Sequence, residues 1–351
     1  MDFRYLEELA SQWLQADATD VFVRTGEVPR VRCNGELVVL DEEVVPEATM
    51  LEFWQACGVD PVEEFERDVR HVMQSGGYLR VNLYRTMDGL AAAIRPLKVD
   101  IPAMADLGVP AEMLREWMNR KSGIILVTGP TASGKSTTLA SCLEAVNLDR
   151  RQHVVTIEDP IEYIFQNKQC YFSQREVNSD TGSFVEALRA ALRQNPDIIL
   201  IGEIRDEETA KIALRAAETG HLVLATLHSS GVVESMERIT NLFPFDKRIS
   251  SLQLLSVQLV GVLSQQLLPG INGGLQLVSE YLQNQGATRK WIREGSYTEL
   301  ADFLRRRENP NTRDLLSGLI EAVEQGRISE QVARNAAPHP GDFERTMRGI
   351  S

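Results

Sequence analysis

The segment GPTASGKST at residues 129–137 constrains the fold of this chain more than any other feature. Its two glycines, Gly129 and Gly134, allow the backbone to curl through conformations that a side chain disfavours. The apolar run GIILVT precedes the segment, and a helical pattern over 135–146 follows it. A buried strand, a glycine-rich loop and a helix in this order predict one unit of a parallel α/β sheet.

The same segment is suited to binding the phosphates of ATP. In the pattern G-x-x-x-x-G-K-[ST], the N–H groups of the loop and the positive end of the next helix both point at an anion. Lys135 is expected to bridge the terminal phosphates, and Ser136 to hold Mg²⁺. The predicted nucleotide-binding residues are Gly129, Pro130, Thr131, Ala132, Ser133, Gly134, Lys135, Ser136 and Thr137. The alternative, a glycine turn beside a surface lysine, does not explain the flanking strand and helix.

Further buried strands alternate with helices after this segment. The runs HVVTIE, DIILIG and HLVLATL are separated by helical stretches near 183–193 and 206–218. Continuous apolar runs of this kind predict a mainly parallel sheet that helices cover on both faces. Ser183 and Asp206 are suited to cap the two helices, and the chain after Leu268 is expected to be mostly helical.

The first part of the chain follows a different pattern. Residues 2–16 place apolar side chains at helical spacing, and short alternating stretches then surround Gly26 and the pair Asn34–Gly35. A proline-marked stretch from 96 to 110 has the character of a linker. We therefore expect a small α+β domain at 1–98, a linker at 99–112, a P-loop core at 113–270 and a mostly helical part at 271–351.

Composition narrows the class of protein. A chain of 351 residues favours two domains, and its net charge of -13 argues against nucleic acid as a partner. Four scattered cysteines without a C-x-x-C pair argue against a zinc knuckle or a disulfide framework. No apolar run approaches the ~20 residues that span a bilayer. The expectation is a cytoplasmic protein without a membrane-spanning segment, able to dock on a membrane machine.

Acidic side chains occur where two of the predicted strands end. Glu158 ends the run HVVTIE, Asp159 and Glu162 follow it, and Glu203 follows the run DIILIG. Ligands of open α/β sheets bind at the carboxyl ends of the strands. ATP hydrolysis needs one carboxylate near Mg²⁺ and another group to orient or deprotonate the attacking water. Glu203 suits the first role, acting through water because a glycine separates it from the strand, and Glu162 suits the second.

Two histidines flank the run LVLATL. His228 follows its carboxyl end and is expected near the γ-phosphate, whereas His221 precedes the run and suits a structural role. Seven residues of extended chain separate them by up to ~23 Å, so they do not share a metal ion.

Four segments in order resemble the boxes that define the secretion ATPases. GPTASGKST, TIEDPIEY, IILIGEIRDEET and HLVLATLHSS are similar to the Walker A, aspartate, Walker B and histidine boxes, respectively. Nearly the whole chain looks like the PilT-type twitching motility (pilus retraction) branch of the type II/IV secretion ATPase superfamily. Pilus assembly motors and type II secretion ATPases generally carry a four-cysteine zinc insert, which this sequence lacks.

The resemblance implies a PAS-like N-terminal domain and a RecA-like core. It also implies a homohexameric ring that acts on an inner-membrane pilus platform protein. The matching positions assign Glu162 to water activation, Glu203 to the magnesium shell and His228 to the neighbourhood of the γ-phosphate. They are the same three residues that the strand ends suggest.

Four arginines also match positions of the family. Arg80 and Arg95 match residues from which the N-terminal domain reaches the nucleotide, and Arg189 and Arg193 match the helix near 183–193. Arginines that neutralise charge in the phosphoryl-transfer transition state are worth ~10³ to 10⁵ in rate. Because Arg189 and Arg193 are four residues apart, they share one helix face, for which a solvated edge is the alternative.

Two positions depart from the family's pattern. Phe22 stands where the N-terminal signature usually has a histidine, and Thr288 stands where the A-I-R motif has isoleucine. An accessory pilus motor or a secretion traffic ATPase would accommodate these changes. A RecA-like nucleic-acid motor and an assembly factor that binds ATP with little turnover are further alternatives.

Overall fold

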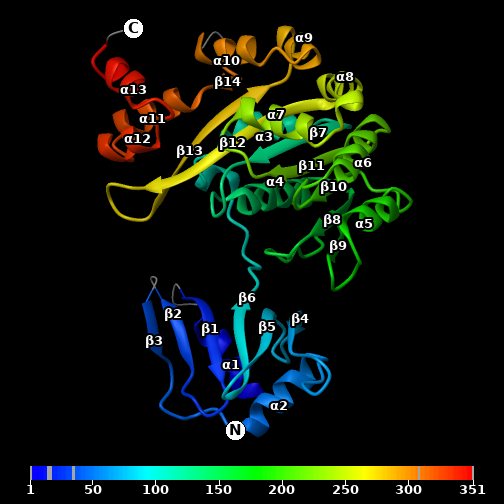
Figure 1. Cartoon of the computed structure of the whole chain (residues 1–351), viewed down its shortest axis with the longest axis vertical. Helices are drawn as coiled ribbons and strands as arrows, with labels where there is room; N and C mark the ends of the chain where they lie inside the picture. Colours follow the sequence, from blue (N-terminus) through cyan, green and yellow to red (C-terminus); the bar gives the residue numbers. More distant parts are fainter. Residues whose placement is uncertain (1, 14–17, 34–35, 307–308, 350–351) are drawn as a thin grey trace. The chain divides into compact units, whose positions relative to one another are not determined.

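The chain divides into two compact units, Met1–Val99 and Asp100–Ser351 (Figure 1). The structure is a computed structural model that describes residues 2–13, 18–33, 36–306 and 309–349. The expected linker at 99–112 contains a short 3-10 helix, η1 (Met104–Asp106), which belongs to the second unit and packs against its helix α4. Each unit has its own hydrophobic core, so each is described separately.

The first unit is an antiparallel sheet with two helices. Its six strands lie in the order β3-β2-β1-β6-β5-β4. Along β5 every second side chain, Leu79, Val81 and Leu83, is buried, as expected for a sheet with one covered face. The predicted turn at Asn34–Gly35 lies outside the described residues. The elements are α1 (Arg4–Trp13), β1 (Ala18–Arg24), β2 (Arg30–Cys33), β3 (Glu36–Val39), α2 (Glu47–Ala56), β4 (Glu66–Val72), β5 (Tyr78–Thr86) and β6 (Gly89–Pro96).

The second unit is built on an eight-stranded sheet in the order β14-β13-β12-β7-β11-β10-β8-β9. The six strands from β12 to β9 are parallel to one another, which confirms the mainly parallel α/β fold. The four strands expected from the sequence are β7 (Gly123–Thr128), β8 (His153–Glu158), β10 (Ile198–Ile201) and β11 (Leu222–Leu227), and β9 (Tyr171–Glu176) was not expected.

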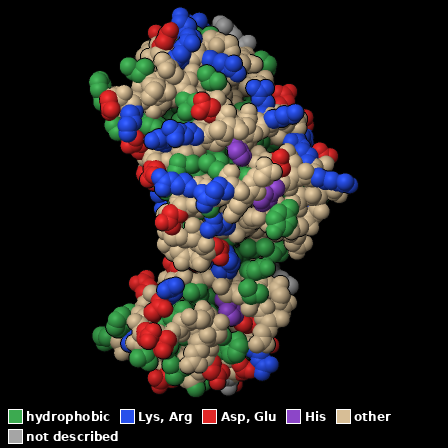
Figure 2. Space-filling view, turned by 90° about the vertical axis from the view of Figure 1, so that its right-hand side faces the viewer, with side chains coloured by type: hydrophobic (Ala, Val, Ile, Leu, Met, Phe, Trp, Pro, Cys, Tyr) green, Lys and Arg blue, Asp and Glu red, His purple; other side chains and the backbone are tan. Residues whose placement is uncertain are grey.

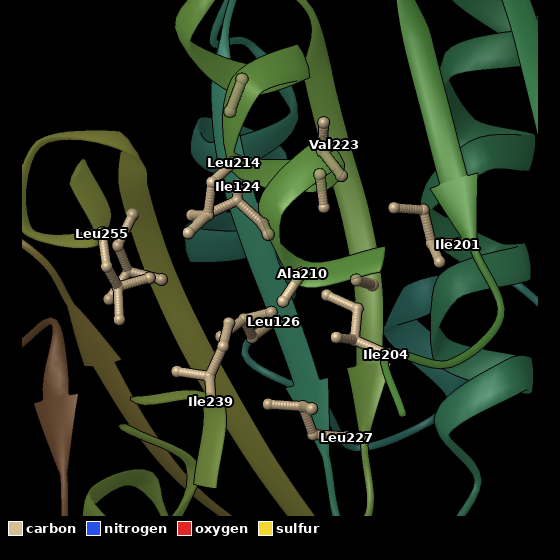
Figure 3. Packing of buried hydrophobic residues seen from close by; sticks show 14 of the residues in the cluster. Ile124, Leu126, Ile201, Ile204, Ala210, Leu214, Val223, Leu227, Ile239 and Leu255 are labelled. Atoms are coloured by element: carbon tan, nitrogen blue, oxygen red, sulfur yellow. The ribbon is translucent and has the colours of Figure 1, made fainter. Parts of the chain in front are cut away.

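Helices cover both faces of this sheet, and the alternation along β7 shows why. Ile124 and Leu126 point into a core formed with helices α5 to α10, part of which Figure 3 shows. Ile125 and Val127 point into a second core formed with α3 and α4. Because helices bury both faces of the sheet, the strands are continuous apolar runs rather than runs in which apolar and polar residues alternate.

The helices of this unit begin largely where the sequence predicted. Ser183 accepts a hydrogen bond from the N–H of Glu186, and Asp206 accepts one from Thr209, which confirms both as N-caps. The helices and remaining short elements of the core are α3 (Ala111–Met118), α4 (Lys135–Asp149), α5 (Phe184–Ala191), α6 (Glu207–Glu218), α7 (Val232–Asn241), η2 (Phe245–Lys247) and α8 (Arg248–Gln258).

The sheet continues past the expected core boundary at residue 270. Strands β12 (Leu259–Pro269) and β13 (Leu275–Gln283) form an antiparallel hairpin, so that boundary falls inside it. The part after Leu268, which was expected to be mostly helical, therefore also contains β13, a strand that was not expected. The rest of this part is mostly helical, with α9 (Ala287–Glu294), α10 (Tyr297–Arg306), β14 (Thr312–Arg313), α11 (Leu315–Glu324), α12 (Glu330–Ala336) and α13 (Pro340–Met347).

Charged side chains of both signs are interspersed on the surface face shown in Figure 2. Most ion pairs among the described residues lie at the surface, such as Lys247 with Glu207 at 2.8 Å, and contribute little to stability. None of the helices in the described ranges is both long and apolar enough to cross a membrane.

A glycine in β12 offers a test of the core packing. A Cβ atom at Gly261 would lie 2.3 Å from the ring of Trp117, which is buried. We expect Gly261→Ala to lower the free energy of unfolding by about 1–3 kcal/mol, because the ring has to move within a packed core. Thermal unfolding of the purified chain measures this. The control Gly341→Ala, where a Cβ meets open space, should leave the melting temperature unchanged or slightly raised.

Candidate active site

The loop between β7 and α4 has the backbone that its glycines predict. Gly129, Ala132 and Gly134 have φ values of 148°, 60° and 84°. A Cβ atom at Gly129 would lie 2.3 Å from the carbonyl oxygen of Gln265. Helix α4 begins at Gly134 without a side-chain cap, which leaves its first N–H groups available to an anion.

A pocket of about 440 Å³ lies over this loop, and Lys135 reaches into it. The Nζ atom of Lys135 donates hydrogen bonds to the carbonyl oxygens of Gly129 at 3.0 Å and Pro130 at 2.8 Å. Burial lowers the pKa of Lys135, while Glu203 and Glu162 act in the opposite direction. The pocket is lined by Thr131, Ala132, Ser133, Gly134, Lys135, Ser136, Thr137, Glu158, Asp159, Pro160, Glu162, Gly202, Glu203, Arg205, Thr226, His228 and Leu267.

Glu162 lies opposite the start of α4. The hydroxyl of Ser136 on α4 donates to Oε1 of Glu162, which lies in the segment after β8, at 2.9 Å. The next residues also meet, because Thr137 Oγ1 and Tyr163 OH are 2.9 Å apart. The segment after β8 is thus attached to α4 at two consecutive positions, and the acid expected to activate water is held beside the phosphate loop.

Glu203 is the centre of a charged group at the ends of β10 and β11. Arg205 Nε donates to Glu203 Oε2 at 2.6 Å, and its Nη1 donates to Asp159 Oδ2 at 3.1 Å. His228 Nε2 lies 3.6 Å from Glu203 Oε1. The hydrogen bond with Glu203 raises the pKa of Arg205, and burial, followed by the charge of Lys135, lowers the pKa of His228. His228 is therefore neutral near pH 7.

Two further residues of the pocket received no role from the sequence. Glu158 is 8% exposed and accepts hydrogen bonds from Thr156 Oγ1 at 2.7 Å and Gln174 Nε2 at 3.4 Å. Burial raises the pKa of Glu158 to about 7. Arg205 was not singled out, although its position two residues after Glu203 was a usable signal.

Arg189 on α5 and Arg193, two residues after the end of this helix, lie elsewhere in the unit. Arg189 pairs with Glu208 of α6, and Arg193 Nη1 donates to the carbonyl oxygen of Arg189 at 3.0 Å. Both guanidinium groups are exposed, and neither lines the pocket of its own chain. The single chain therefore does not bring them to the acids.

The first unit holds the other two arginines. Arg80 and Arg95 are register partners on β5 and β6. Arg95 also donates to Asp20 Oδ1 from Nε at 2.9 Å and from Nη2 at 2.6 Å. Phe22, the first departure from the family's pattern, lies on the neighbouring β1, where the guanidinium of Arg32 sits 5.7 Å from its ring centroid.

His221 and Thr288 have local structural partners. His221 Nδ1 lies 3.0 Å from the carbonyl oxygen of Ala216, at the end of β11 away from the pocket. Thr288 is buried at the start of α9, where its hydroxyl donates to Asn284 Oδ1 at 2.9 Å and accepts from the N–H of Gln285 at 2.9 Å. Threonine at this position therefore satisfies backbone and side-chain groups that isoleucine would leave unpaired.

The curled loop, the buried lysine and the acids at the strand ends define a P-loop nucleotide-binding protein. Residues 75–317 match the family described as type II/IV secretion system protein. The chain is 35% identical to the type IV pilus retraction ATPase PilT of Pseudomonas aeruginosa, covering 96% of this chain and 99% of that protein. It is 33% identical to the type IV pilus ATPase PilU of the same organism, covering 96% and 90%.

A solved structure, described as the pilus retraction motor PilT and bound ADP, superposes with a TM-score of 0.89. It is 37% identical and covers 98% of this chain and 99% of its own. The chain belongs to the type II/IV secretion system protein family, within which it is an ATPase of the PilT type.

Two carboxyl groups whose pKa is raised in the folded chain predict how stability depends on pH. The folded-state pKa of about 7 for both Glu158 and Glu280 lies above the ordinary value of 4.5, so each favours folding while protonated. Their contribution is complete below pH 4.5 and is lost as the pH rises through about 7. We expect Glu158→Gln to flatten this fall in melting temperature between pH 5 and pH 8. The exposed control Glu112→Gln should leave the profile unchanged, and an unchanged profile in Glu158→Gln would contradict the assignment.

Proposed function

We propose that this chain is a cytoplasmic motor that hydrolyses ATP to retract type IV pili. In this proposal six copies form a ring on an inner-membrane pilus platform protein, and changes in domain orientation during hydrolysis do mechanical work. The observation that supports it most is the contact of Glu162 with Ser136, which places an acid against the phosphate loop. The similarity to PilT over nearly the whole chain supports the pilus as the target.

The proposed roles follow from the charges around the pocket. Glu162 is the carboxylate that acts as general base and takes a proton from the attacking water, because it lies beside the residues that face the terminal phosphates. Lys135 supplies a cation to those phosphates, and neutral His228 donates an N–H hydrogen bond to the γ-phosphate. Arg205 balances the charge of Glu203 and keeps its carboxylate oriented.

The oxygen donors near the loop fit Mg²⁺. Ser136 would hold the ion directly and Glu203 would hold it through water, as expected for a cation that keeps several waters. Among the described residues no group of three or more His, Cys, Asp or Glu side chains is arranged for a metal, which agrees with a site completed by phosphate oxygens. When bound, the ion would neutralise charge that develops on the phosphates.

The exposed arginines belong to the proposed ring rather than to the single chain. Arg189 and Arg193 would neutralise charge in the transition state across a subunit boundary, with Arg189 leaving Glu208. Arg80 and Arg95 would reach the nucleotide from the N-terminal unit. This division explains why Arg205 is the one arginine that lines the pocket in the described part of the chain, beside the carboxylates, the lysine and the histidine.

Substitutions at Lys135 and Glu162 separate binding from hydrolysis. Lys135→Ala should weaken ATP and ADP binding strongly, because the phosphates lose their buried cation. Glu162→Gln should lower kcat by about 10²-fold or more and leave nucleotide affinity within about twofold of the wild type. Steady-state phosphate release and nucleotide titration measure the two effects. Full turnover in Glu162→Gln would remove this residue from the role of base.

The direction of the motor is tested in cells. Deletion in the source organism should give hyperpiliated cells that do not twitch, because pili are made but not withdrawn. Cells without pili would point to assembly instead. The 33% identity to PilU favours an accessory pilus motor as the second candidate, for which twitching would weaken only partly.

A further inference from the structure

The segment that carries Glu162 has little regular structure of its own. Residues 159–166 follow β8 and form neither a helix nor a named strand. Their side chains nevertheless alternate, since Ile161, Tyr163 and Phe165 are 1%, 4% and 8% exposed while Glu162 is exposed. Something outside the segment must therefore fix its register, because a shift by one residue would bury Glu162.

Two side chains of β9 bind the backbone on both sides of Glu162. Glu176 Oε2 accepts a hydrogen bond from the N–H of Ile161 at 3.0 Å. Gln174 uses both ends of its amide, accepting from the N–H of Phe165 at 2.8 Å and donating to the carbonyl oxygen of Tyr163 at 2.9 Å. The segment is thus fastened one residue before Glu162, and again one and three residues after it.

The two side chains are themselves held firmly. Strand β9 pairs in parallel with β8, with Gln174 opposite Thr156 and Glu176 opposite Glu158. Glu176 is 8% exposed, and its second oxygen accepts from Ser179 Oγ at 3.0 Å. A buried carboxylate forms strong hydrogen bonds with backbone N–H groups. Removing one partner leaves the other buried and unpaired, which costs free energy.

We infer that Gln174 and Glu176 are positioning residues that hold Glu162 against Ser136. The inference rests on the proposed role of Glu162 in water activation. Neither β9 residue lines the pocket, so each acts through Glu162 rather than on the nucleotide. Because a displacement of about 1 Å of a catalytic group can cost ~10²-fold in rate, loss of these hydrogen bonds lowers kcat.

A matched pair of variants at Glu176 in the full-length chain tests this. Glu176→Ala should lower kcat for ATP hydrolysis tenfold or more, with KM for ATP and Kd for ADP within about twofold of the wild type. Glu176→Gln should keep kcat within about threefold, because its amide oxygen still accepts from Ile161. Ser179→Ala, which removes the other partner of Glu176 without touching the segment, should behave like the wild type.

A purely structural role predicts a different pattern. A wild-type kcat in Glu176→Ala, or a loss of ADP affinity in proportion to kcat, would overturn the inference. If Glu176→Ala does not fold, Gln174→Met, which keeps the side-chain length but removes both hydrogen bonds to the segment, replaces it with the same expected split.

The double variant Glu162→Gln with Glu176→Ala makes the test specific. Since both changes act on one group, the double variant should be no slower than Glu162→Gln alone, and a further tenfold loss would refute the inference. Failure of the proposed function has a different signature, which is full activity in Glu162→Gln itself. An inactive Glu162→Gln beside a fully active Glu176→Ala would refute the positioning role alone.

Discussion

The close approach of β12 to the phosphate loop is the contact on which the site depends. The carbonyl oxygen of Gln265 lies 2.3 Å from the position that a Cβ of residue 129 would take, and Gln265 Nε2 donates to the carbonyl oxygen of Ser133 at 2.7 Å. Gln265 is completely buried. Glycine therefore allows the loop to curl, and β12, a strand far along the chain, fixes its position. Helix α4 begins directly after the loop, and its first N–H groups have no side-chain cap.

The acids reach the loop because parallel strands end at one edge of the sheet. Glu158 ends β8, and Glu203 and His228 follow β10 and β11, so three separate segments meet above the loop. Their charges are balanced locally. Glu203 faces Arg205 and lies near His228, and Lys135 is held between the loop carbonyls and these acids. Glu162 lies four residues after the end of β8, in an irregular segment, which is why the side chains of β9 matter.

Much of the core could be predicted from the sequence. The strands that depend on packing with the rest of the sheet, β9 and β13, could not. Four strands, two helix caps and the phosphate loop followed from apolar runs and from the chemistry of Ser, Asp and Gly. Strand β13 was missed because its pattern is only partly apolar, and β9 was missed because YFSQRE has no clear period. Arg189 and Arg193 were expected at the nucleotide. In the single chain both are exposed, Arg189 on α5 and Arg193 just after this helix, so their role belongs to the proposed ring.

The sequence by itself determined the chemistry: a loop that binds phosphate, acids and a histidine at strand ends, and membership of a family whose boxes occur in order. These features depend on residue type and on short spacings, both of which can be read from the sequence. Only the tertiary structure decided which groups touch. The contacts of Glu162 with Ser136, of Arg205 with Glu203 and Asp159, and of β9 with the segment after β8 join residues 2 to 46 positions apart. Most of these depend on strand order and burial, which no local pattern specifies.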